Sequence, residues 1–172
     1  MTDLAVRGNF NTSVLKSYAD DPEWQRTWLN LETEDWRSLA VVPTGEECSL
    51  ELVHALASVA WQQTGASLIV ADMRAVALRS LAAVKSELRR RTERGERMLV
   101  ALRSLDKNPT TATLVRELDK AVICVYLEHS SRADVQKTVR ELGPQRCLGS
   151  IVVRSNRVSS PKRQVQLHND SG

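Results

Sequence analysis

Short apolar runs alternate along most of the chain with longer segments in which apolar residues recur at helical spacing. Residues 121–127, AVICVYL, are apolar throughout, which is typical of a strand buried on both faces of a sheet. In residues 49–63, by contrast, Leu52 and Leu56 lie one helical turn apart, as on a helix that packs against a sheet. The pattern predicts strands at residues 38–42, 67–71, 98–102, 121–127 and 147–153, and helices at 49–63, 76–93, 110–118 and 131–142.

This alternation of strands and helices predicts the fold class. A helix that connects two parallel strands crosses over in the right-handed sense, and such units build a sheet with helices on both faces. We therefore expect an α/β domain with one doubly wound, mostly parallel sheet of five strands. The expected division is a flexible arm at residues 1–21, a tryptophan-rich helical or docking segment at 22–36, the α/β domain at 37–153 and a flexible tail at 154–172.

Residues 38–74 organise the domain. They predict a strand that Pro43 and Gly45 stop, a tight loop, a helix that ends at Gly65, and a second strand with Asp72 at its end. A strand, a loop and a helix in this order are how nucleotide-binding domains begin, with the phosphate at the helix N-terminus. The stretch therefore indicates a nucleotide-binding scaffold, and its loop residues decide whether a nucleotide site remains.

The loop PTGEECS and the strand ending in ADMR resemble motifs of the deviant-Walker ATPases of the MinD/ParA class. Within that class, the chain looks closest to the cytoplasmic domain of the bacterial tyrosine kinases of capsule and exopolysaccharide synthesis. The resemblance covers residues 37–153 and implies a trimmed P-loop-like fold. The phosphate loop of that family resembles P-x-G-E-G-K-S. Matching residues are Pro43, Gly45, Glu46 and Ser49, whereas Glu47 stands in place of a glycine and Cys48 in place of the lysine.

Two further family motifs also have partial counterparts here. An apolar strand leading into D-x-D-x-R resembles the segment in which Asp72 and Arg74 match, while Val70 stands where the first aspartate is expected. The strand that ends in an acidic residue corresponds to RMLVALRSL, and Ala101 occupies the acidic position. The resemblance therefore places a degenerate site at three separate points of the chain.

These departures remove the chemistry on which a phosphate loop depends. Glycines let backbone N–H groups face the phosphates, and the lysine neutralises the β- and γ-phosphates. Here Glu46 and Glu47 add negative charge and Cys48 supplies no cation. Ser49 keeps an oxygen for Mg²⁺, but its usual acidic companion is Ala101. We therefore expect no catalytic residues and no cofactor.

The resemblance then implies a catalytically inactive regulatory or scaffolding protein that acts through protein contacts. Its partner is expected in exopolysaccharide synthesis or export, such as a membrane polysaccharide copolymerase or export component, and self-association stays open. The alternative is a nucleotide-dependent switch ATPase that a partner subunit completes, with ATP and Mg²⁺ as its cofactors. ATP-dependent dimerisation separates the two hypotheses.

Charge gives little support to a nucleic-acid partner. The net charge of +3 arises from 24 basic and 21 acidic residues that are mixed along the chain. The most basic stretch, KSELRRRTERGER at residues 85–97, alternates arginine with glutamate, which favours a solvated helix face over a nucleic-acid patch. Three widely spaced cysteines and no long apolar run predict a reducing compartment, no direct membrane insertion and a cytoplasmic protein.

Three of the four tryptophans, Trp24, Trp28 and Trp36, lie close together in the N-terminal part of the chain. They are candidates for partner binding, but the interpretation we favour is that they pack this segment against its own domain. The lone histidines His54 and His129 have no second ligand at metal spacing, so no metal site is expected.

Overall fold

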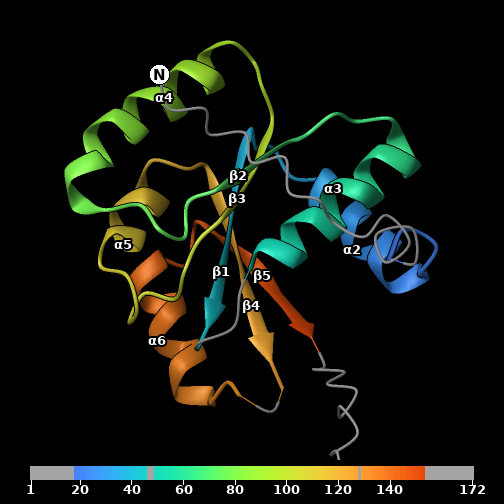
Figure 1. Cartoon of the computed structure of the whole chain (residues 1–172). Coiled ribbons are helices and arrows are strands. Elements are labelled where there is room, and N and C mark those ends of the chain that lie inside the picture. The colour runs from blue at the N-terminus through green and yellow to red at the C-terminus, as the bar shows by residue number, and fades with distance from the viewer. Residues whose placement is uncertain (1–17, 46–48, 128, 154–172) are drawn as a thin grey trace, which may run out of the picture.

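The computed structural model describes residues 18–45, 49–127 and 129–153. Within these ranges, five parallel strands form one sheet that lies between two layers of helices (Figure 1). The elements are α2 (Pro22–Glu32), β1 (Ser38–Thr44), α3 (Leu50–Thr64), β2 (Ile69–Asp72), the 3₁₀ helix η1 (Leu78–Ser80), α4 (Leu81–Glu93), β3 (Met98–Ala101), α5 (Thr110–Arg116), β4 (Lys120–Tyr126), α6 (Arg132–Leu142) and β5 (Cys147–Val153). The predicted α/β fold class is confirmed.

The strands follow the order β2-β3-β1-β4-β5 across the sheet. β1 therefore lies at the centre, between β3 and β4, and its register pairs Val41 with Ala101 on one side and with Val122 on the other. All seven residues of β1 are buried, as expected for a strand covered on both faces. The sequence predicted the strands and their connections, and the structure adds their spatial order.

Several predicted boundaries differ from the structure by one or two residues, and two of the differences change how an element is described. β1 was expected to stop at Pro43, but it continues through Pro43 to Thr44, which pairs with Val125 of β4. The carbonyl of Val41 faces β3, so the backbone groups of Pro43, two residues later, face the same side. The last β1–β3 pair is Val41 with Ala101, so no β3 residue lies opposite Pro43. Proline is therefore tolerated here, because no hydrogen bond is lost with its missing N–H. The helix predicted from residue 76 begins instead as the short turn η1, and α4 follows from Leu81.

The sheet separates two apolar cores. Leu39 and Val41 of β1 join α2 and α3 on one face. Ala40 and Val42 point to the other face, where α4, α5 and α6 pack (Figure 1). Because both faces of the strand are covered, residues 39–42 are all apolar rather than alternately apolar and polar. Because all five strands run parallel, their carboxyl ends lie at one edge of the sheet, where ligands of such sheets bind.

The tryptophan-rich segment is part of the first core. It forms α2, and Trp28 and Trp36 are 0% and 4% exposed. Their rings meet edge to face with centroids 6.2 Å apart, and the guanidinium carbon of Arg97 lies 4.2 Å from the ring centroid of Trp36. These contacts support the interpretation that the segment packs against its own domain. Only Trp24, half-buried and stacked edge to face on Tyr18, keeps a surface that a partner can reach.

Candidate functional site at the carboxyl edge of the sheet

The structure brings the described residues of the predicted phosphate loop, together with Asp72, to one edge of the sheet. Pro43 and Gly45 lie at the carboxyl end of β1, Ser49 precedes α3, and Asp72 ends β2. Val70 lies inside β2, two residues before Asp72. Ligands of parallel α/β sheets bind at this edge. Three predicted positions, Glu46, Glu47 and Cys48, lie outside the described residues.

Ser49 is buried and tied to the end of β3. Its Oγ donates a 2.6 Å hydrogen bond to the carbonyl oxygen of Leu102, and the residue is 0% exposed. Leu102 directly follows Ala101, so the position that the resemblance assigns to the acidic residue lies next to Ser49 in space. Ala101 itself is 0% exposed and belongs to the first apolar core. The position that the resemblance assigns to the acidic residue therefore carries a buried methyl group.

Asp72 forms a close ion pair with Arg74. The guanidinium donates from Nε to Oδ1 and from Nη2 to Oδ2, both at 2.7 Å, and the Arg74 backbone N–H adds a bond to Oδ1. The hydrogen bonds from Arg74 hold the pKa of the Asp72 carboxyl below its usual range, although burial opposes this. The carboxylate of Asp72 is thus bonded to a residue only two positions further along the chain. The pair fixes the chain as it leaves β2.

Replacing Asp72 with asparagine is expected to lower the free energy of unfolding by up to about 1 kcal/mol at neutral pH, because the ion pair is partly exposed. The pKa of Asp72 is lowered in the folded state, so its contribution is present above the unfolded pKa of about 4 and is lost as pH falls below it. Urea unfolding of both proteins at several pH values checks this. A difference between them that stays constant down to about pH 3 would contradict it.

The loop between β4 and α6 covers the end of β1. Ser130 Oγ donates to the carbonyl oxygen of Thr44 at 2.7 Å and accepts the backbone N–H of Tyr126 at 3.1 Å. Gly45 follows Thr44 with φ +107°, in the left-handed region that favours glycine. Ser130 is a site residue that was not predicted from the sequence. A hydroxyl just beyond a strand's carboxyl end is the signal that would have indicated it, since such residues converge on the same edge.

His54 of α3 also lies toward this edge. Burial lowers the pKa of its imidazole, and the negative charge of Asp72 partly opposes that shift. In the described part of the chain, no cluster of three or more histidine, cysteine or acidic residues has a geometry that could hold a metal ion.

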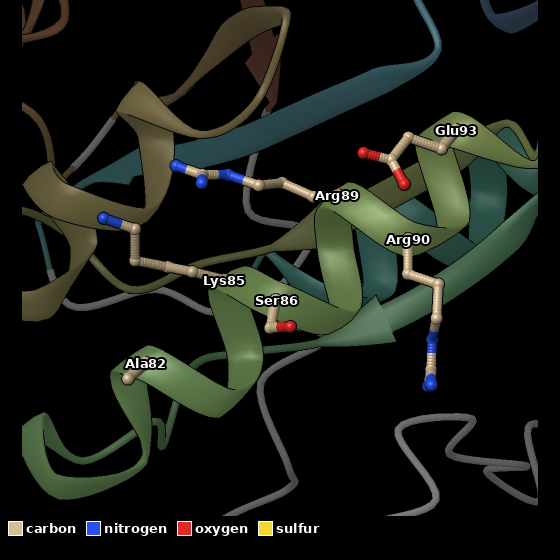
Figure 2. A pocket seen from close by; sticks show the side chains of 6 residues that line it. All are labelled: Ala82, Lys85, Ser86, Arg89, Arg90 and Glu93. Carbon is tan, nitrogen blue, oxygen red and sulfur yellow. The ribbon is translucent and has the colours of Figure 1, made fainter.

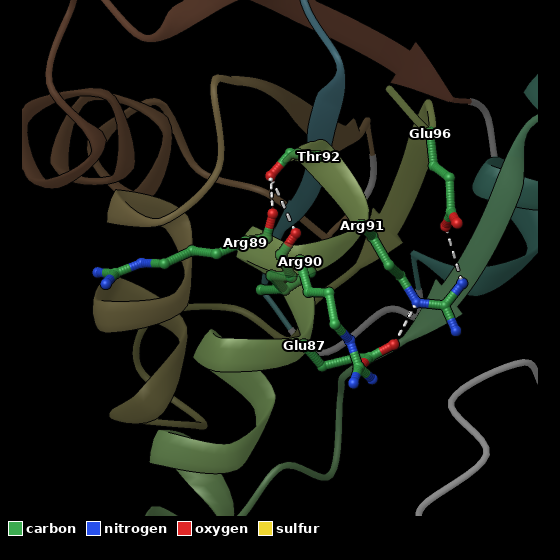
Figure 3. A network of polar contacts seen from close by, with 7 residues as sticks. Glu87, Arg89, Arg90, Arg91, Thr92 and Glu96 are labelled. Atoms are coloured by element: carbon green, nitrogen blue, oxygen red, sulfur yellow. Dashed lines mark hydrogen bonds and ion pairs between the residues drawn. The ribbon is translucent and has the colours of Figure 1, made fainter. Parts of the chain in front are cut away.

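The basic stretch predicted from the sequence forms the outer face of α4. A surface pocket lies over this face, and its described lining, from Ala82 to Glu93, comes from α4 alone (Figure 2). The cations there are paired: Lys85 and Arg89 contact Glu117 at 2.6 and 2.7 Å. Arg90 and Arg91 contact glutamates of the same helix region, Glu87 and Glu96 (Figure 3). This matching of charge supports the solvated helix face over a nucleic-acid patch.

The described residues thus define an α/β domain with an all-parallel sheet and a carboxyl edge at which Asp72 and Ser49 are bonded within the protein. Comparison of the chain with protein-family models, with curated proteins and with solved structures returned no match. Among the described helices, none is both long enough and apolar enough to cross a membrane.

Proposed function

We propose that this protein is a catalytically inactive, P-loop-like regulatory or scaffolding protein that acts through protein contacts. The observation that carries the proposal is the burial of Ala101 in the apolar core, one residue before the Leu102 carbonyl that Ser49 Oγ binds. A magnesium ion bridging two phosphates needs oxygen ligands at this point, and an apolar core residue offers none. The sheet and helices are retained, while the position that would serve only the chemistry has become part of the core.

The other polar groups at the edge agree with this proposal. The carboxylate of Asp72 is neutralised by Arg74, and the loop that follows β4 is bonded to the end of β1 through Ser130. In the sequence, the phosphate-loop lysine is replaced by Cys48, so a triphosphate would lack its main neutralising cation. Each feature reduces affinity for a nucleotide by a different physical route.

The resemblance to the kinases of capsule and exopolysaccharide synthesis suggests the setting of this role. We propose a cytoplasmic protein that binds a membrane polysaccharide copolymerase or export component. Such a protein would keep the surface of its active relatives and lose their chemistry. This proposed partner rests on the resemblance alone, whereas the proposed lack of activity also rests on the bonding of the candidate site.

Titration of the full chain with Mg-ATP in a calorimeter tests the proposal. We expect no binding tighter than about 1 mM, and no phosphate release above that of a protein-free blank. The same sample must unfold cooperatively on heating, which excludes loss of the fold as the cause. Micromolar binding, or an ATP-dependent shift in elution volume, would overturn the proposal and favour the switch ATPase.

A further inference from the structure

The outer edge of β5 is the longest unpaired strand edge in the described structure. β5 runs from Cys147 to Val153 and pairs only with β4 among the described strands (Figure 1). Val152 is 55% exposed, and its neighbours on the strand are exposed or half-buried. The strand contains neither a charged residue nor a proline, two of the features that keep an edge from pairing, and its one register shift against β4 lies at its start, before Gly149.

The hydrogen bonds to β4 define which backbone groups face outward. The carbonyl of Val153 accepts the N–H of Leu127, so Val153 and, two residues earlier, Ile151 direct their backbone groups to β4. The N–H and C=O groups of Ser150 and Val152 therefore point to the open edge. Their side chains are also exposed, because α6 packs over β4 and β1 and leaves this part of β5 uncovered.

The opposite edge of the sheet is built differently. β2 has four residues, and it ends at Asp72, whose carboxylate is bonded to Arg74. A short strand that ends in a charged pair offers little to a neighbour. The charged residue before β5, Arg146, instead turns inward and donates from Nη1 to the carbonyl oxygen of Leu118 at 2.7 Å. The two edges thus differ in length and in the charge they present.

We propose that the β5 edge binds the β5 edge of a second copy of this chain, in antiparallel pairing around a two-fold axis. In a pairing of two identical strands, any charged residue brings a like charge close to its own copy, and β5 has no charged residue. A contact around a two-fold axis also stops at two subunits and does not continue into a chain of subunits. Pairing centred on Ile151 places Ser150 of each copy opposite Val152 of the other. Each such pair then exchanges N–H···O=C bonds in both directions, and the two sheets become continuous. The proposal does not depend on the state of the candidate site.

Light scattering of the full chain after size-exclusion chromatography tests this pairing. We expect a mass of about twice 19.2 kDa for the wild type. Val152→Pro removes an N–H that faces outward, so it is expected to weaken dimerisation at least tenfold while the bonds to β4 remain. Val70→Pro is the control for a lost N–H at the opposite edge: Ile69 and Met73 direct their N–H groups to β3, so the N–H of Val70 points outward. Because Val70 packs against the first core, this variant is compared only if it unfolds cooperatively. This control is expected to stay dimeric.

Each outcome decides for or against the proposal. A dimer lost in Val152→Pro and kept in Val70→Pro supports it. A wild-type monomer, a dimer that survives Val152→Pro, or a dimer lost equally in both variants overturns it. If Val152→Pro fails to unfold cooperatively, Val152→Lys, which changes only an exposed side chain, replaces it in the same comparison. A monomer that dimerises only without residues 154–172 would assign the edge to the chain's own tail and would also overturn the proposal.

Discussion

Replacing Trp28 with alanine is expected to lower the free energy of unfolding by about 3–5 kcal/mol. Trp28 is 0% exposed and packs edge to face against Trp36 in the core that lies between the sheet and α3. Arg97 stacks above both rings, with its guanidinium carbon 5.9 Å from the ring centroid of Trp28. The substitution therefore leaves a cavity, and it also removes an aromatic contact from the cation of Arg97.

Urea unfolding of the variant checks this expectation, and Trp61→Ala is the matched control. Trp61 lies on α3 with 64% of its surface exposed, so its removal should change stability by less than about 0.5 kcal/mol. If Trp28→Ala retained wild-type stability and lost only the binding of a partner, Trp28 would belong to a docking surface, contrary to its burial. Trp24→Ala, at a half-buried position, is the variant of choice for testing partner binding.

Much of the fold could be predicted from the sequence because local patterns carry it. The continuous apolar run of β4 and the helical stripe of α3 are set by which faces are buried, and both elements were found close to their true bounds. The end of β1 was placed too early because the tolerance of Pro43 depends on β3 ending first, at Ala101. That condition is a relation between strands far apart in sequence, and no local pattern shows it.

The candidate site could be predicted in position but not in its bonding. Strand ends converge in any parallel sheet, so Ser49 and Asp72 were expected at one edge, and they lie there. The partner of Ser49 is the carbonyl of Leu102, which follows β3 and is distant in sequence. The partner of Asp72 is Arg74, which is only two residues away. The position of Ser130 just beyond a strand end could have been found in the same way, but its bond to Thr44 could not, since it joins residues 86 positions apart.

Introducing the acidic residue that the family resemblance assigns to Ala101 provides the strongest test of the inactive site. Ala101→Asp is expected to destabilise the fold by at least about 3 kcal/mol at neutral pH, because a carboxylate without a partner is costly in an apolar interior. Ala101 is 0% exposed and pairs in register with both Val41 and Asp72. Mg-ATP should not restore the lost stability.

Ala101→Asn separates charge from size, because asparagine has nearly the same shape and no charge. Burial should raise the pKa of the new aspartate above about 4, the usual value for a free carboxyl. The aspartate variant is therefore expected to be less stable than the asparagine variant at neutral pH. This difference should shrink as pH falls through the raised pKa, because the aspartate then becomes uncharged. Thermal unfolding of both variants with and without Mg-ATP measures this. An aspartate variant with wild-type stability that Mg-ATP stabilises further would mean that the edge keeps a working metal geometry, because only a bound ligand raises stability in this way. In that case a single substitution at Ala101 would restore a nucleotide site. The proposed inactivity would then result from the loss of individual side chains and not from a change in the core.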